Sequence, residues 1–139
     1  MQSTRFALGV HILAVLALRD GEAVPSETIA ASINTNPSFV RQILGRLRKA
    51  KLVTARLGAG GGAVLARPAG RIRLDEVYRL MEPGPAVALH HSEPSATCPV
   101  GRNIRPILSP VLERAEAAQL AELARVTVAD LVKQVRKRG

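Results

Sequence analysis

Acidic residues are missing from the middle of this chain of 139 residues. Positions 28–74 contain no aspartate or glutamate, but they contain nine arginines and lysines. The charge is therefore uneven: residues 1–73 carry a net charge of +8 and residues 74–139 a net charge of +1. Positive charge that is clustered in this way indicates contact with a polyanion rather than a role in solubility alone.

Cysteines, aromatic residues and long apolar runs are also scarce. Cys98 is the only cysteine, so the chain cannot form an internal disulfide, and we expect a cytoplasmic protein. Aromatic residues make up 2% of the chain, which predicts a helical core of Leu, Val, Ile and Ala and few platforms for stacking single-stranded bases. The apolar run Phe6–Leu18 is shorter than the ~20 residues that cross a bilayer. It predicts a buried first helix and no membrane partner.

The first half of the chain predicts three helices, over residues 4–18, over residues 26–33 with Ser26 as its cap, and from Pro37 onward. Asn36 followed by Pro37 is a strong helix start, because Asn caps the free N–H groups and Pro suits the first turn. In the third helix the apolar residues recur at helical spacing and predict the buried side: Val40, Ile43, Leu44 and Leu47. The opposite side carries polar, basic or small residues: Ser38, Arg41, Gln42, Gly45 and Lys49.

A glycine-tipped hairpin follows the third helix. Leu52–Leu57 and Ala63–Arg67 read as strands, and Gly58–Gly62 reads as the tip between them. No Gly-Lys-Ser/Thr follows these glycines and the next element is a strand, which excludes a phosphate-binding loop of a nucleotide enzyme. The order helix, helix, strand, glycine tip, strand is that of a winged helix-turn-helix, with the hairpin as the wing.

The second half of the chain predicts a helix over Leu74–Met81, a loop, a helical stretch over residues 100–123 and a last helix over residues 128–136. Pro106 and Pro110 lie inside the long stretch, which is therefore either one kinked helix or two helices with Ser109 capping the second. Apolar residues form a seam along it: Ile104, Leu108, Val111, Ala115 and Ala118. The predicted fold is mainly α with a small β-hairpin.

Several segments of the chain resemble the Rrf-two family of bacterial transcription regulators. In chain order they are Asn34–Pro37, Ile43–Val53, Gly60–Gly62, Leu65–Pro68, Leu74–Tyr78 and Cys98–Gly101. Each is common alone, but this order is specific and spans nearly the whole chain. The resemblance implies a homodimer with a winged helix-turn-helix DNA-binding domain at 1–82, a sensor loop at 83–100 and dimerisation helices at 101–139.

The chain departs from the family pattern at three places. Several members hold an iron–sulfur cluster with three loop cysteines, but only Cys98 is present here, and thiolates hold such clusters. We therefore expect no cluster and no other cofactor. Where the family often has Arg before the wing glycine this chain has Leu57, with Arg56 one position earlier and thus on the opposite strand face. Ala63 replaces a residue that is often aromatic.

The candidate DNA contacts fall on the third helix and the wing. Ser38, Arg41 and Gln42 are the predicted base readers, with a solvated helix face as the alternative. Gly45 permits close approach of the backbone to phosphates. The predicted phosphate contacts are Arg46, Arg48, Lys49, Lys51 and Arg56, and the wing glycines Gly60 and Gly61 complete the set.

Two kinds of side chain in the second half have open interpretations. Cys98 is either a redox sensor or a small buried residue. His90 and His91 fit a solvated loop better than a metal site, because adjacent histidines do not easily face one ion. In the first helix, His11 reads as a hydrogen-bonded core histidine.

Together these patterns predict a sequence-specific, homodimeric DNA-binding transcription regulator that acts as a repressor and responds to redox signals through Cys98. Two recognition helices in successive major grooves, about 34–36 Å apart, require a near-palindromic operator of double-stranded DNA. The alternative is a winged-helix adaptor that binds protein or structured RNA. An enzyme is not expected, since no paired carboxylates, activated nucleophile or metal set is found in the sequence.

Overall fold

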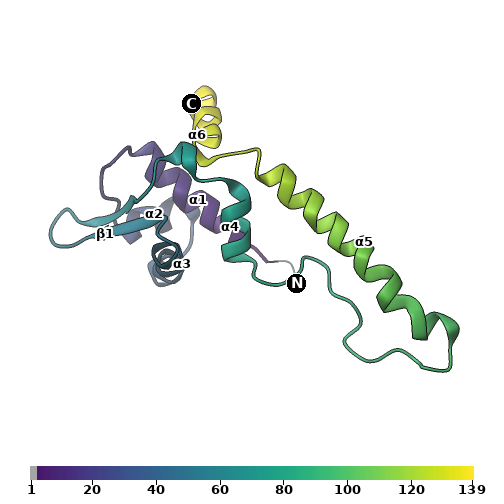
Figure 1. The fold of residues 1–139 in the computed structure, drawn as a ribbon. Helices are drawn as coiled ribbons and strands as arrows, with labels where there is room; N and C mark the ends of the chain where they lie inside the picture. The colour runs from purple at the N-terminus through teal and green to yellow at the C-terminus, as the bar shows by residue number, and fades with distance from the viewer. Residues whose placement is uncertain (1–2) are drawn as a thin grey trace.

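The computed structural model describes residues 3–139, and these form six α-helices, one short 3-10 helix and one antiparallel hairpin (Figure 1). In chain order the elements are α1 (Arg5–Leu18), α2 (Ser26–Ile33), α3 (Pro37–Lys49), β1 (Val53–Arg56), β2 (Gly62–Leu65), η1 (Ala69–Arg71), α4 (Leu74–Met81), α5 (Pro99–Leu123) and α6 (Val128–Arg138). The fold is thus mainly α with a small hairpin, as the sequence predicts.

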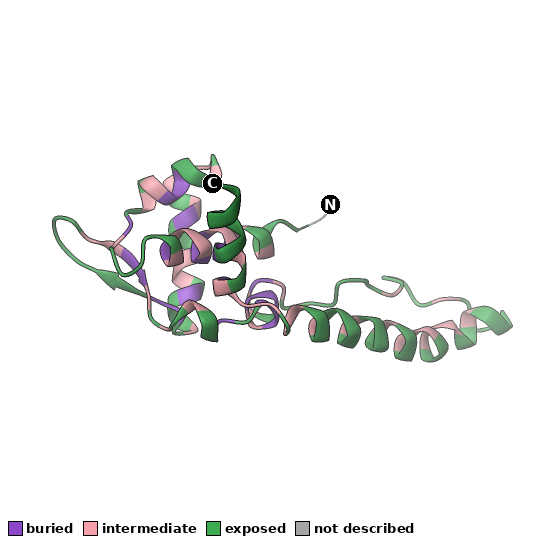
Figure 2. Ribbon diagram, turned by 90° about the horizontal axis from the view of Figure 1, so that it is seen from above, coloured by how far each residue is buried: buried purple, intermediate pink, exposed green. Residues whose placement is uncertain are grey.

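One hydrophobic core holds together α1–α4, α6 and the hairpin, which we call the head. Ile12, Leu13 and Leu16 place the apolar side of α1 at its centre, and Val128 and Val132 bring α6 into the same core. Figure 2 shows that the buried residues gather in the head. The predicted buried first helix is confirmed.

The turn between α2 and α3 is set by local sequence. Asn36 precedes α3, and its side-chain oxygen accepts a hydrogen bond from the Phe39 N–H at 2.8 Å, so the predicted cap is confirmed. Ser26, in contrast, is the first residue of α2 and its side chain caps nothing, because Pro25 occupies the cap position. The prediction that Ser26 caps α2 is therefore wrong.

The wing is joined to the helices as well as to itself. Val53 pairs with Leu65 and Arg56 with Gly62 in the hairpin. Val24, between α1 and α2, exchanges two backbone hydrogen bonds of 2.9 Å with Ala63 on β2. This bridge ties the base of the wing to the segment that enters the helix-turn-helix.

The long helix α5 projects from the head and, with the loop 83–98 beside it, forms what we call the arm (Figure 1). It is one α-helix of 25 residues, which decides between the two sequence alternatives: no second helix begins at Ser109. Pro106 and Pro110 are both exposed. Water can therefore satisfy the carbonyl groups that these prolines leave without a backbone donor.

After the arm the chain returns to the head. Thr127 and Asp130 form the predicted capping box at the start of α6, with bonds of 3.2 and 2.9 Å. Leu74 donates its backbone N–H to Val126 at 2.9 Å, and Val128 donates to Ile72 at 2.9 Å. These bonds fix α6 against the start of α4, so its apolar side packs into the head. The domain division at residues 82 and 100 stays a prediction.

Candidate nucleic-acid interface

The outward side of α3 is the first part of the candidate interface. Val40, Ile43 and Leu47 are buried in the head, as predicted. Leu44, also predicted for the buried side, is only half-buried, because it lies at a hollow between α3 and the hairpin. The side chains of the predicted contacts on α3 are directed away from this core and are exposed: Ser38, Arg41, Gln42, Arg46, Arg48 and Lys49. A helix of this kind can offer polar groups to base edges and cations to phosphates.

A hollow of about 310 Å³ lies between α3 and the hairpin. Four of the predicted contacts, from two elements, line it: Arg41, Gly45 and Arg48 of α3 and Arg56 of β1. Thr54 and Ser26 also line the hollow, and the sequence reasoning did not assign either of them to the site. Their contribution depends on how β1 and α2 fold beside α3, which no local pattern reveals.

Gly45 lies on the same side of α3 and leaves a gap in the row of side chains. A Cβ atom built at this residue would meet no atom of the chain within 4 Å. Internal packing therefore does not require glycine here, although glycine weakens a helix interior. The open space is consistent with the predicted close approach of a phosphate backbone.

The structure divides the nine basic residues of the acid-free stretch into two groups. Three of them have carboxylate partners from outside that stretch: Arg41 with Glu27, Arg67 with Glu76 and Arg73 with Asp75. The other six have no ion-pair partner among residues 3–139: Arg46, Arg48, Lys49, Lys51, Arg56 and Arg71. The free positive charge therefore lies mostly on α3 and the wing.

The pair between Arg41 and Glu27 concerns a predicted base reader. Its N–O distance is 3.1 Å, and both side chains are more than half exposed. Exposed pairs of this kind contribute at most about 1 kcal/mol, so Arg41 can leave Glu27 for a stronger acceptor at little cost. Glu27 lies one position before the acid-free stretch, and the sequence reasoning missed this contact.

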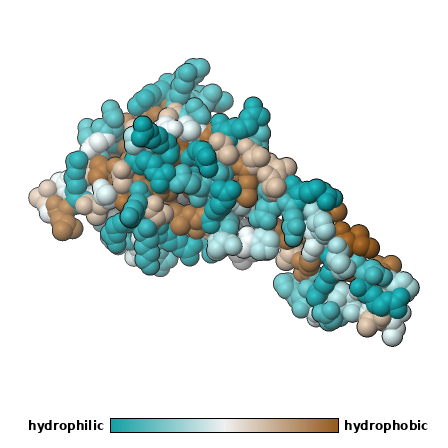
Figure 3. Space-filling view, in the orientation of Figure 1, coloured by the Kyte–Doolittle hydropathy of each residue, from teal (hydrophilic) through white to brown (hydrophobic). Residues whose placement is uncertain are grey.

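The wing tip is apolar as well as glycine-rich. Leu57 is 94% exposed. This apolar side chain differs from most of the visible face of the head, where Figure 3 shows hydrophilic side chains. Gly60 adopts a left-handed backbone, and a Cβ atom at Gly61 would lie 2.3 Å from the Arg56 carbonyl oxygen. The tip therefore requires small residues, and Arg56 carries the cation nearest to it on β1.

The loop of the arm is fastened to α5 by Arg105. Its guanidinium donates to the carbonyl oxygens of His90 and Ser92 at 2.6 and 2.9 Å and pairs with Glu93 at 2.9 Å. At Gly101 a Cβ atom would lie 2.3 Å from the Ser95 carbonyl oxygen, so the loop also approaches the helix backbone closely. No local pattern in the sequence signals this clasp.

Cys98 is exposed and occupies the cap position of α5, so the interpretation as a small buried residue is wrong. His90 and His91 are also exposed, which agrees with a solvated loop. His11 is hydrogen-bonded as predicted, with its Nε2 atom 2.9 Å from the Ser32 hydroxyl oxygen, but it is half-buried and lies at the edge of the core.

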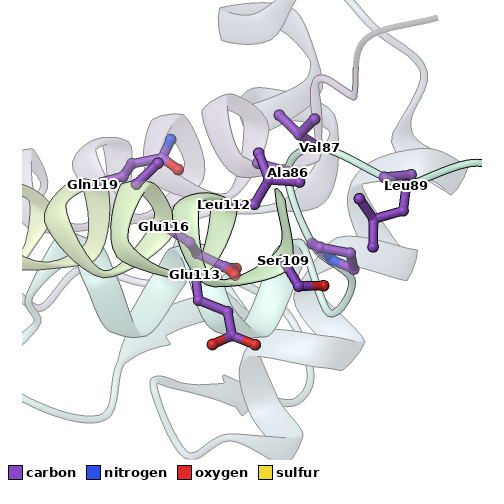
Figure 4. Close-up of a pocket in the computed structure, with 11 residues that line it drawn as sticks. Ala86, Val87, Leu89, Ser109, Leu112, Glu113, Glu116 and Gln119 are labelled. Atoms are coloured by element: carbon purple, nitrogen blue, oxygen red, sulfur yellow. The ribbon is translucent and has the colours of Figure 1, made fainter. Parts of the chain in front are cut away.

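An apolar cavity of about 380 Å³ lies between the loop and α5. Ala86, Val87 and Leu89 come from the loop, and Ser109 and Leu112 from the helix (Figure 4). The cavity lies in the predicted sensor loop, where a bound molecule would contact both parts of the arm.

Asp75, at the start of α4, is the buried polar residue of the head, with 2% of its surface exposed. Burial disfavours its charge, but the guanidinium groups of Arg73 and Arg79 outweigh this effect and hold the pKa of Asp75 below its ordinary value. Their nitrogens lie 2.9–3.1 Å from its carboxylate oxygens. This cluster stabilises the junction where α6 returns to the head.

Within the described residues, no group of three or more His, Cys, Asp and Glu side chains is placed to hold a metal ion. In the same part of the chain, none of the helices combines the length and hydrophobicity that crossing a membrane requires.

The family model that matches residues 2–134 is Rrf2, described as an iron-dependent transcriptional regulator. The chain is 36% identical over 132 residues to YwnA of Bacillus subtilis, provisionally named an HTH-type transcriptional regulator, and the match covers 95% of this chain and 97% of YwnA. Among solved structures, IscR of T. potens has a TM-score of 0.74 and 26% identity, covering 97% of this chain and 88% of IscR. CymR of Staphylococcus aureus has a TM-score of 0.73 and 28% identity, covering 94% and 96%.

The description of the family names iron, but the residues of one chain do not fit a cluster of the family type. Cys98 is the only thiol, and no further ligating side chains converge on it among residues 3–139. One thiolate is a poor donor set for iron and sulfide.

Proposed function

This chain belongs to the Rrf2 family of transcriptional regulators, and on that basis we propose that it is a homodimeric, sequence-specific DNA-binding repressor. Its family and relatives are regulators and not enzymes. The observation that carries the proposal is the hollow where Arg41, Arg48 and Arg56 meet beside the unpaired cations of α3. Residues 1–82 form the DNA-binding domain, 83–100 the sensor loop and 101–139 the dimerisation segment.

In the complex α3 lies in the major groove. Ser38, Arg41 and Gln42, near the start of the helix, contact base edges, while Arg46, Arg48 and Lys49 contact phosphates. Arg56, Gly60 and Gly61 bring the wing to the adjacent backbone. Two copies of α3, related by a two-fold axis and about 34–36 Å apart, require a near-palindromic operator.

Fluorescence anisotropy with a promoter fragment from the neighbourhood of the gene tests this proposal. Arg41→Ala and Gln42→Ala should weaken discrimination between base pairs, by about 1–3 kcal/mol where the contact is bidentate. Lys49→Ala should weaken all sequences alike and flatten the dependence on salt. If the protein binds another protein or structured RNA and random duplex DNA does not compete for that binding, the adaptor alternative replaces the repressor.

Repression is tested separately from DNA binding. A repressor bound at an operator that overlaps a promoter lowers transcript yield in a reconstituted reaction. A higher transcript yield under the same conditions would support DNA binding but would show that the protein is an activator and not a repressor.

Cys98 is the proposed sensor of redox signals. Its thiolate takes one oxygen atom from hydrogen peroxide and one proton from water and becomes a sulfenic acid, while the peroxide is reduced to water. Its exposure and its place at the start of α5 support this role, and the related CymR of Staphylococcus aureus has been solved in an oxidized form. Operator binding is measured before and after mild peroxide treatment in the parent and in Cys98→Ser. If the parent and Cys98→Ser respond identically, Cys98 is not the sensor.

A further inference from the structure

One carboxylate lies within the cationic part of the head. Between Glu22 and Asp75 the only acidic residue is Glu27, in the first turn of α2. A negative charge there weakens the attraction of this surface for phosphates. The segment from α3 to β1 otherwise carries cations that have no ion-pair partner among residues 3–139: Arg46, Arg48, Lys49, Lys51 and Arg56.

Glu27 contacts one of the predicted base readers. Its Oε1 atom accepts a hydrogen bond from Nη2 of Arg41 at 3.1 Å, from α2 to α3. Within residues 3–139 this is the only hydrogen bond that either side chain makes. The carboxylate therefore acts on the one cation of α3 that is placed to read a base and leaves the predicted phosphate contacts unpaired.

The helix α3 itself gives the side chain of Arg41 little support. Long side chains on a helix lean toward its N-terminus, so the residue one turn later would cover Arg41. That residue is Gly45, and the space beside it is empty. Arg48 and Arg56 line the same hollow as Arg41 and repel its guanidinium. The contact with Glu27 therefore restricts a side chain that would otherwise sample many rotamers.

The pair with Glu27 leaves Arg41 able to bind a base. The N–H groups of a guanidinium form two forks, one end-on from Nη1 and Nη2 and one side-on from Nε and Nη2. Glu27 occupies one of the two N–H groups of Nη2, so one fork stays complete whichever of them is bound. Either fork matches the O6 and N7 acceptors that guanine presents in the major groove.

We infer that Glu27 is a positioning residue for base recognition, which holds the guanidinium of Arg41 so that its free fork meets a guanine. The inference rests on the proposed DNA-binding function and adds to it a residue outside α3. Glu27 touches no base itself. It fixes Arg41 before binding, so the contact with guanine costs less conformational entropy. Its effect is therefore on the choice of base pair and not on overall attraction to DNA.

Two other roles for Glu27 would give different results. A carboxylate in the first turn of a helix is favoured by the helix dipole, and in that role Glu27 affects only the stability of α2. A carboxylate that withdraws Arg41 from DNA would weaken operator binding, so its removal would strengthen binding with the base preference intact. A positioning residue alone lowers the base preference when its charge is removed.

Fluorescence anisotropy with the promoter duplex and its single-base variants tests the inference. Arg41→Ala first identifies the base pair at which Arg41 discriminates. There Glu27→Gln should lower the preference for guanine by about two- to fivefold, the range that an exposed ion pair can supply. Binding to random duplex DNA should not weaken, because no cation is lost. Glu122→Gln, which removes the charge from an exposed pair on the arm, is the matched control and should change neither property.

A double-mutant cycle shows whether the effect passes through Arg41. In an Arg41→Ala background, Glu27→Gln should change discrimination at no base pair, because the group that it positions is gone. A loss of discrimination that persists in this background would assign the effect to the fold of α2 and overturn the inference. Stronger operator binding by Glu27→Gln with an unchanged preference would overturn it as well.

The outcomes also separate this inference from the proposed function. A parent chain that prefers no promoter duplex over random DNA would overturn both. If the parent discriminates and either Arg41→Ala or Glu27→Gln keeps its full preference, the role of Glu27 is overturned and DNA binding stands. Both side chains are more than half exposed, so the variants should fold. Circular dichroism checks this, and Glu27→Ala replaces Glu27→Gln in the same cycle if the glutamine variant does not fold.

Discussion

The head and the arm use hydrophobic residues in opposite ways. In the head, α1 alone buries Ile12, Leu13 and Leu16 almost completely, and every other helix there contributes to the same core. In the arm, none of the 25 residues of α5 is buried, although Ile107 and Val111 are as apolar as the residues of the core. The same chemistry therefore stabilises the fold of one region and remains available for contact in the other.

This difference indicates where each region obtains its stability. The head has enough internal contacts to fold around its own core, and its free charges face outward on α3. The arm is kept in place within one chain by the Arg105 clasp and by contact of α5 with α4. Such a helix gains most from a partner, since apolar area removed from water is its largest unused source of free energy.

The largest expected effect comes from equivalent truncations in the two regions. Leu47→Ala in the head should lower the free energy of unfolding by about 2–5 kcal/mol, because it leaves a cavity. Ile107→Ala on the arm should change it by less than about 0.5 kcal/mol at protein concentrations where the chain is monomeric. Urea denaturation measures both. Equal losses would show that the arm belongs to the core.

The second-largest effect on the free energy of unfolding is expected at the junction between the head and the arm. Asp75→Asn should cost about 1.5–3 kcal/mol at pH 7, because Arg73 and Arg79 lose a charged acceptor. The folded pKa of Asp75 is lowered, so its contribution is complete above the unfolded pKa of about 3.9 and is lost as the pH falls through the lower folded value.

The difference between the parent and Asp75→Asn should therefore shrink below pH 4, as followed by urea denaturation across the acid range. Glu122→Gln, which removes the exposed pair with Arg125 on the arm, should cost no more than about 1 kcal/mol. A pH-independent difference for Asp75→Asn would show that its charge does not stabilise the junction.

Gly45→Ala separates stability from binding on the surface of the head. The change should raise the free energy of unfolding by about 0.5–1 kcal/mol, because alanine favours the helix and meets no atom of the chain. If α3 lies against phosphates as proposed, the same methyl group should weaken operator binding. Thermal denaturation and anisotropy measure the two effects, and unchanged affinity would place the DNA elsewhere.

The smallest effect on overall stability is expected in the loop of the arm. Arg105→Met removes the donors to His90 and Ser92, so amide exchange over residues 86–97 should rise about tenfold or more. The stability of the head should stay within about 0.5 kcal/mol. Arg102→Met is the matched control on the same helix and should leave exchange unchanged.

Features that depend on neighbouring residues could be predicted from the sequence. Asn36 caps α3 and Thr127 with Asp130 forms a capping box, because each motif needs only three or four consecutive residues. The inward side of α3 follows from helical spacing in the same way. Ser26 shows the limit even of local reasoning: Pro25 occupies the cap position, and the helix begins at Ser26, one residue earlier than expected.

Contacts between distant segments could not be predicted in this way. The acid-free stretch indicated a positive surface, but Glu27 reaches Arg41 from another helix. The hollow between α3 and the hairpin also brings Arg56 of β1 to the same place as Arg48 of α3. Local hydrogen bonds and side-chain periodicity are encoded by adjacent residues, and they define the helices and the family of this chain. Which cations remain free, and which apolar side chains remain uncovered, depends on how those elements pack, because burial and pairing are properties of the whole arrangement.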